Sequence, residues 1–229
     1  MDINTTEIKK HFDYFLGSVE TNRDHPVLYV ISGGNGAGKS TLRALLFKEN
    51  KLPKNALHHD PDSVMLRLSG YQNDLGKPPW NLQNLKNAFD KWEKPARILA
   101  ERILQQSIKQ KSHIIYERSC GMPDSLEFIS SLVNSGYQLN YYLVHTDTDI
   151  SLDRAKKRSS KEGRFTPPEI IKKRTRQLQK LCPEYLKLST TVQIYDNTND
   201  TPQLVYEKSP SKGEKIYNSA RYRRILGLS

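Results

Sequence analysis

One glycine-rich segment restricts the fold of this chain more than any other feature. Residues 33–40 read Gly-Gly-Asn-Gly-Ala-Gly-Lys-Ser and match the pattern GxxxxGK[ST] in full, between the apolar run 27–32 and a stretch of helical character. A short apolar run is typical of a buried parallel strand, and glycines let successive backbone N–H groups turn toward an anion at a helix start. The segment therefore predicts a phosphate-binding loop. A glycine-rich turn without a ligand is the alternative, which the flanking elements disfavour.

Each position of this loop has an expected part in binding ATP and Mg²⁺. Lys39 is expected to reach the β- and γ-phosphates, and the hydroxyl of Ser40 is expected to be a ligand of Mg²⁺. The expected ATP-binding residues are Gly33, Gly34, Asn35, Gly36, Ala37, Gly38, Lys39, Ser40 and Thr41. The loop alone leaves open whether the γ-phosphate goes to water or to an acceptor.

Strand-like runs alternate with helical stretches along the chain. Strands are expected at 27–32, 56–59, 113–117, 137–144 and 192–195, with 203–208 as an edge strand. Between residues 82 and 108 the periodic segment contains Pro95, so separate helices are expected before and after it. This alternation predicts an α/β P-loop NTPase or kinase fold, with a mostly parallel central sheet flanked by helices and the site at the carboxyl ends of the strands.

The length of 229 residues fits a single domain. We expect an N-terminal helix within residues 1–25, a core over 27–200 with a lid at about 150–176, and an edge strand and basic tail over 201–229. No apolar stretch reaches the roughly 20 residues of a membrane span, and no secretory signal opens the chain. A cytoplasmic protein without a membrane partner is therefore expected.

The net charge of +11 predicts anionic partners. Much of it lies between residues 154 and 176, where two expected helices form a lid rich in arginine. Arg154 and Arg158 are one helical turn apart and Arg174 follows in the second helix, so the three can converge on a transferring phosphate. A solvated basic surface is the alternative. Nucleic acid is not the expected partner, because the chain lacks an interleaved series of aromatic residues for base stacking.

Carboxylates follow two of the expected strands. A small-molecule kinase needs a carboxylate beside the acceptor hydroxyl, and Asp60 and Asp62 sit at such a place, with Asp62 the preferred base. Asp-Pro-Asp-Ser is also good turn and helix-capping sequence, so the residues alone leave both interpretations open. Glu117 is placed to hold the acceptor or a metal-bound water, or to form a salt bridge at the rim.

From about Val27 to Asp200 the chain resembles the zeta-toxin family of P-loop kinases. The resemblance rests on the order of ISGGNGAGKSTL, Asp60-Pro61-Asp62, Glu117-Arg118-Ser119, the arginine-rich segment and Tyr195-Asp196-Asn197-Thr198. It implies ATP-dependent phosphorylation of a small acceptor, UDP-N-acetylglucosamine being the family's best-known acceptor. It also implies the roles by position: Asp62 as catalytic base, Lys39 as the phosphate-loop lysine, Glu117 as an acceptor-contacting acid, and Arg158 and Arg174 as lid arginines.

The chain departs from the family where the acceptor should bind. Glu162-Gly163-Arg164-Phe165 stands in place of Gly-Gly-His, and Arg118-Ser119 replaces the usual threonines. The expected substrate-binding residues are Asp60, Glu117, Arg154 and Arg164. Other acceptors stay open, namely a nucleotide, NAD, another sugar or an antibiotic, as does a nucleotide-gated nucleic-acid-binding protein. The resemblance further implies an antitoxin-like inhibitory protein as a partner, and cytoplasm of a target cell as an alternative location for a delivered effector.

Overall fold

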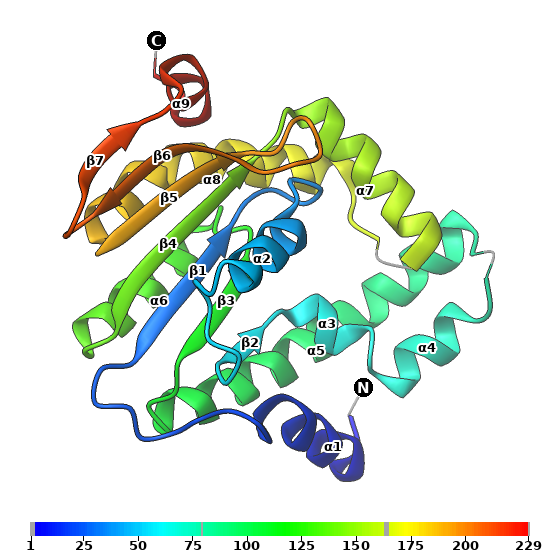
Figure 1. Cartoon of the computed structure of the whole chain (residues 1–229). Helices are drawn as coiled ribbons and strands as arrows, with labels where there is room; N and C mark the ends of the chain where they lie inside the picture. The colour runs from blue at the N-terminus through cyan, green and yellow to red at the C-terminus, as the bar shows by residue number, and fades with distance from the viewer. Residues whose placement is uncertain (1–2, 79, 163–164, 229) are drawn as a thin grey trace.

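A single twisted sheet runs through the molecule, as Figure 1 shows for the computed structural model of the chain. Among residues 3–78, 80–162 and 165–228, which the structure describes, seven strands are hydrogen-bonded in the order β2-β3-β1-β4-β5-β6-β7. Their bounds are β1 Val27–Ser32, β2 Leu57–His59, β3 Ile114–Arg118, β4 Gln138–His145, β5 Thr191–Asp196, β6 Gln203–Ser209 and β7 Gly213–Ile216. Strands β1 to β5 pair in parallel, whereas β6 and β7 are antiparallel to their neighbours.

Helices cover both faces of this sheet. The helices are α1 Thr5–Leu16, α2 Lys39–Lys48, α3 Pro61–Met65, α4 Ser69–Leu75, α5 Leu82–Lys109, α6 Pro123–Asn134, α7 Thr148–Glu162, α8 Pro168–Leu188 and α9 Ser219–Leu226. In Figure 1, α2 lies in front of the sheet, and α6 and α8 lie behind it. The arrangement confirms the predicted α/β class with a mostly parallel central sheet flanked by helices.

The alternation of side chains along the strands divides the apolar interior into two cores. On β1, Leu28 and Val30 face the larger core, which α5, α6 and α8 complete. Ile31 faces the opposite way and belongs to the smaller core beneath α2. Because both faces of β1 are covered, this strand is apolar up to Ser32, where the glycine-rich loop begins.

Helix α5 is continuous through Pro95, which corrects the expected break into two helices. Its buried stripe runs through both halves, from Leu85 and Trp92 before the proline to Leu99 and Ile103 after it. Burial of this stripe against the sheet and against α3 and α4 outweighs the one backbone hydrogen bond that a proline cannot donate. Helix α4 had not been expected from the sequence, and it packs on α5, with Gly70 facing the Trp92 ring.

The C-terminal segment is folded onto the sheet. Residues 203–209 form a strand as expected, but β7 pairs with it and takes the edge position. Helix α9 follows, with Ile225 in the larger core and the Tyr222 ring stacked on Tyr206 at a centroid distance of 4.8 Å. The basic tail expected within 201–229 thus contains a short helix. None of the described helices has the length and apolar character that a membrane crossing requires.

We expect Pro95→Ala to raise the free energy of unfolding by roughly 1–3 kcal/mol, because alanine restores the missing hydrogen bond inside α5. Pro123→Ala is the matched control, since Pro123 stands at the start of α6, where no intrahelical bond is lost, and should change stability by less than about 1 kcal/mol. Urea unfolding followed by circular dichroism measures both. Equal effects of the two substitutions would contradict an uninterrupted α5.

Candidate active site

The glycine-rich loop joins β1 to α2 in a conformation that excludes larger side chains. Gly36 and Gly38 have φ angles of +85° and +99°, which residues with a Cβ rarely adopt. A Cβ on Gly36 would lie 2.1 Å from the carbonyl oxygen of Ser151, and a Cβ on Gly38 would lie 2.0 Å from Nδ2 of Asn197. The loop therefore packs between the segments that follow β4 and β5. The predicted residues 33–41 make up this loop and the start of α2.

The two polar side chains after the glycines take different directions. Nζ of Lys39 donates to the carbonyl oxygens of Gly33 and Gly34 at 3.0 and 3.2 Å, so its ammonium lies over the loop. Oγ of Ser40 donates instead to Oε1 of Glu117 at 3.2 Å. A cation over a ring of backbone groups, with a hydroxyl beside a carboxylate, has the donors and acceptors that a phosphate and a hard cation require.

Glu117 is a buried carboxylate at the end of β3, and its exposed fraction is 3%. Its Oε2 accepts from Nη1 of Arg43 at 2.8 Å and from Nε2 of His58 at 3.0 Å. Burial alone would raise the pKa of Glu117, but the hydrogen bond from His58 and the charges of Arg43 and Lys39 lower it below its usual value. Glu117 is thus held ionised beside Ser40. It forms an ion pair, though in the interior rather than at a rim.

The two aspartates after β2 have different surroundings. Oδ1 of Asp60 accepts from the backbone N–H of Asp62 at 3.2 Å, and its Oδ2 accepts from Oγ of Ser63 at 2.7 Å. Asp60 therefore caps α3, as the turn interpretation predicts. Asp62 lies in the first turn of α3 and lines the cavity described next. Burial lowers the pKa of both Arg97 and Arg174, and the charge of Asp62 opposes this effect, so its carboxylate lies near both guanidinium groups.

One cavity gathers most of the residues predicted to be catalytic or to bind the substrate. It opens between the glycine-rich loop, α3, α5, the end of β3, α7 and α8. The predicted residues that line it are Asn35, Lys39, Asp60, Asp62, Glu117, Arg158 and Arg174. Nδ2 of Asn35 also donates to Oγ1 of Thr166 at 2.9 Å, which connects the glycine-rich loop to the segment before α8. Residues far apart in sequence thus meet at the carboxyl ends of β1, β2 and β3, where the sequence predicts a site.

Two further arginines of the cavity were not predicted. Arg97 comes from α5 and pairs with Glu93, and Nη1 of Arg118 donates to Oε1 of Glu101 at 3.0 Å. Arg97 could not be assigned from the sequence because an expected break at Pro95 separates it from the first half of α5. Arg118 had a signal, since it replaces a family threonine directly after Glu117, but its type alone did not show where it points.

Arg154, which the sequence also predicts for the site, does not join this group. Arg154 does not line the cavity; its Nη2 donates to the carbonyl oxygen of Asn197 at 2.9 Å and to Oδ1 of Asp200 at 2.6 Å. Arg158 and Arg174 therefore share the cavity without it. Arg164 and Gly163 lie outside the residues that the structure describes, so the substrate-binding role of Arg164 stays a prediction.

Comparisons with known proteins agree with this architecture. A family model described as Zeta toxin matches residues 15–209, most of the chain. The structure of the PezAT chromosomal toxin-antitoxin system of Streptococcus pneumoniae is similar over 100% of this chain and 90% of that chain, at 19% identity and a TM-score of 0.69. No protein of curated function matches the sequence.

The AvrRxo1-ORF1:AvrRxo1-ORF2 complex is similar over 98% of this chain and 72% of that chain, at 13% identity and a TM-score of 0.73. The same complex with ATP aligns over 96% of this chain and 71% of that chain, at 13% identity and a TM-score of 0.71. At such identities the likeness establishes the fold alone. The predicted P-loop kinase-like fold is confirmed.

The lowered pKa of Glu117 predicts a pH-dependent contribution to stability. The folded carboxylate gives up its charge at lower pH than the unfolded one, so its contribution is complete above about pH 4.5 and is lost as the pH falls below that value. Glu117→Gln should lower the free energy of unfolding by about 3–5 kcal/mol near neutral pH, because Arg43 loses its buried partner. The deficit should shrink as the pH falls toward about 3.

Glu127, an exposed residue of α6, supplies the control. Urea unfolding near neutral pH and at about pH 3 gives the free energy of unfolding of each variant. Glu127→Gln should change stability little at either pH. A deficit of Glu117→Gln that stays constant across this range would show that the carboxylate is not held ionised.

Proposed function

The chain belongs to the zeta toxin family, and from this premise we propose that it is an ATP-dependent kinase that phosphorylates a hydroxyl group of UDP-N-acetylglucosamine. One observation carries the proposal: Lys39 of the phosphate-binding loop and Asp62 of α3 line the same cavity. Transfer to an acceptor needs a phosphate-binding group and a proton acceptor within reach of each other.

The nucleotide side of the site is formed by the loop between β1 and α2. Backbone N–H groups of residues 33–40 would surround the β-phosphate, and Lys39 would move from the loop carbonyls to the β- and γ-phosphate oxygens. Ser40 and Glu117 would hold Mg²⁺, directly or through a water molecule, because both present oxygen atoms and Glu117 is ionised. The ion would offset negative charge on the phosphates.

On the acceptor side, Asp62 would accept the proton of the attacking hydroxyl. The hydroxyl oxygen would form a bond to the γ-phosphorus as the bond between that phosphorus and the bridging oxygen of ADP breaks. Arg158 and Arg174 would contact the oxygens of the phosphoryl group in transfer, a task that suits the planar guanidinium. Asp60 would act indirectly, because its capping bonds fix the first turn of α3 and with it the backbone of Asp62.

The charge of the cavity favours an acceptor that itself carries phosphate. Arg97, Arg118 and Arg174 are half-buried. Burial lowers the pKa of Arg97 and Arg174, and the nearby charge of Arg118 lowers it further. Arg97 pairs with Glu93 and Arg118 with Glu101. Buried like charges are costly unless a counter-charge approaches them. The diphosphate of a nucleotide sugar would add a counter-charge there, as would a nucleotide or NAD, whereas a neutral sugar or a cationic antibiotic would not.

The proposal includes an inhibitory protein partner of the antitoxin kind. Support comes from the family and from the descriptions of the similar structures, which name a toxin-antitoxin system in one case and a two-protein complex in the other. A kinase that consumes a nucleotide sugar needs such restraint in the cell that makes it.

Incubation of the purified protein with Mg-ATP and UDP-N-acetylglucosamine should yield a product heavier by one phosphate, detected by mass spectrometry. Asp62→Asn should bind ATP normally and lose transfer by about 10²- to 10⁴-fold, because the hydroxyl proton then has no acceptor. Lys39→Ala should lose ATP turnover altogether.

Lys172→Ala serves as the control, since Lys172 lies on α8 two residues before Arg174, is exposed and does not line the cavity. Its transfer rate should equal that of the wild type. Transfer to another member of a metabolite panel, with UDP-N-acetylglucosamine untouched, would overturn the acceptor and retain the kinase. A normal transfer rate for Asp62→Asn would show that Asp62 is part of the turn and is not the proton acceptor.

A further inference from the structure

The side chain of Asn197, in the segment after β5, forms a hydrogen bond with the phosphate-binding loop. Asn197 has an exposed fraction of 2%, and its Nδ2 donates to the carbonyl oxygen of Ala37 at 2.9 Å. In a trans peptide the C=O and the following N–H point in opposite directions. The bond to Asn197 therefore turns the N–H of Gly38 away from Asn197, toward the side of the loop on which an anion would be surrounded by amides.

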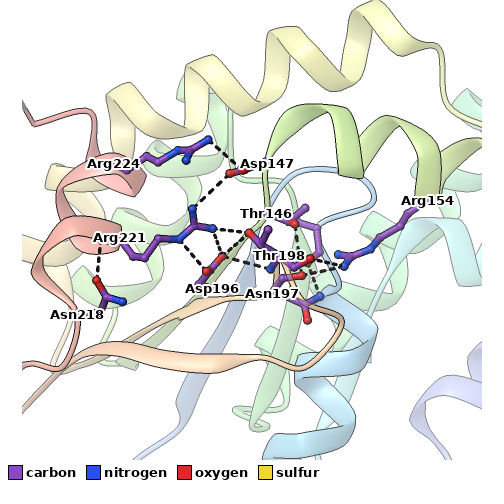
Figure 2. Close-up of polar contacts among 10 residues, drawn as sticks. Thr146, Asp147, Arg154, Asp196, Asn197, Thr198, Asn218, Arg221 and Arg224 are labelled. Atoms are coloured by element: carbon purple, nitrogen blue, oxygen red, sulfur yellow. Dashed lines mark hydrogen bonds and ion pairs between the residues drawn. The ribbon is translucent and has the colours of Figure 1, made fainter.

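Asn197 is itself fixed by its backbone, as Figure 2 shows in part. Its N–H donates to the carbonyl oxygen of His145 at 2.7 Å. Its carbonyl oxygen accepts from Oγ1 of Thr146 at 3.3 Å and from Nη2 of Arg154 at 2.9 Å. These contacts connect it to the end of β4 and to α7.

The residues on both sides of Asn197 are held by one arginine of the C-terminal helix (Figure 2). Nε and Nη2 of Arg221 donate to Oδ2 and Oδ1 of Asp196 at 2.7 and 2.6 Å. Nη2 of Arg221 also contacts Oγ1 of Thr198, and that hydroxyl donates to Oδ1 of Asp196 at 2.7 Å. A bidentate, partly buried pair of this kind is among the stronger polar contacts in proteins.

Helix α9 presents Arg221 from a fixed position. Oδ1 of Asn218 caps the helix by accepting from the N–H of Arg221 at 3.0 Å, and Nη2 of Arg224 lies 3.0 Å from Oδ2 of Asp147. Ile225 and Leu226 are buried in the larger core. The arginine is therefore not part of a loose basic tail, and its distance from β5 is set by helix packing.

We infer that Arg221 is a positioning residue of the nucleotide site: through Asp196 and Thr198 it holds Asn197 against Ala37, and thereby aims the N–H of Gly38 at the phosphates. The inference rests on the proposed function, because it concerns the loop proposed to bind ATP. It extends the site to α9, which lies beyond residues 15–209 matched by the family model. The basic C-terminal segment thus acts in nucleotide binding without contacting the nucleotide.

Isothermal titration of Arg221→Gln with ATP, and separately with tripolyphosphate, tests this inference. Both dissociation constants should rise by about 5- to 150-fold, the usual range for coupling between distinct sites. Arg223→Gln is the matched control on the same helix, because Arg223 is exposed, and it should bind both ligands as the wild type does. Arg221→Lys should recover part of the loss, since one charged hydrogen bond to Asp196 remains available.

Tripolyphosphate separates an effect on the phosphates from an effect on the base. Weakened binding of ATP with unchanged binding of tripolyphosphate would overturn the inference, because the segment after β5 would then act on the nucleoside. Asn197→Ala should weaken binding as much as Arg221→Gln, and the double variant should be no weaker than either single variant. Additive losses would show that Arg221 does not act through Asn197.

Circular dichroism must show native helix content for each variant used. Asn197→Ala keeps the contacts between Arg221 and Asp196, so unchanged ligand affinity in this variant overturns the inference even where Arg221→Gln fails to fold. A wild-type protein that binds neither ligand would overturn the proposed function and this inference together. Normal wild-type binding, with Arg221→Gln equally tight, would overturn the inference alone.

Discussion

The pairing of β1 between β3 and β4 is the constraint on which the rest of the site depends. In this parallel register Ser32 lies opposite Arg118 of β3 and opposite Leu143 of β4. The glycine-rich loop that follows Ser32 must therefore pass between the segments that leave those two strands. The hydrogen bond between Ser40 and Glu117 and the close approach of Gly36 to Ser151 both follow from this arrangement. A loop of larger residues could not occupy the same space.

Charge is arranged around this loop in two groups with separate tasks. Glu117 contacts Arg43, His58 and Ser40 in the interior. It remains ionised because its polar and charged surroundings lower its pKa more than burial raises it. On the other side of Lys39 the cavity is lined by four arginines, with Asp62 among them. The first group fits a hard cation and the second fits an anionic acceptor, so a triphosphate between them would have its transferable end directed at Asp62.

Sequence reasoning located the loop and the strands β1 to β6, because the glycine pattern and the apolar runs are local signals, but it did not predict β7. A run of glycines before Lys39 predicts a phosphate-binding loop. The strand β1 is apolar on both faces because helices bury both faces of the sheet there. The course of α5 could not be predicted, because local propensity treats Pro95 as a break, whereas the energy that keeps the helix intact comes from packing of residues as far apart as Leu85 and Ile103.

The same limit applies to the site. Asp62 was preferred as base from its place after a strand, and it lies in the cavity with Lys39, while Asp60 proved to be a cap. Arg97 and Arg221 had no signal, since their positions depend on which helix face meets the sheet. Contacts between elements distant in sequence decide such roles, and periodicity within one element does not reveal them.

The most direct test of the account is a nuclear magnetic resonance titration of the isotopically labelled protein with Mg-ATP, followed through the backbone amides. Binding of phosphates by the loop predicts large, saturable downfield shifts of the Gly36, Gly38 and Lys39 amide protons, with little change along α4, which lies apart from the cavity. Unchanged loop amides, or shifts confined to another region while ATP binds, would contradict the claim that the backbone of this loop holds the triphosphate.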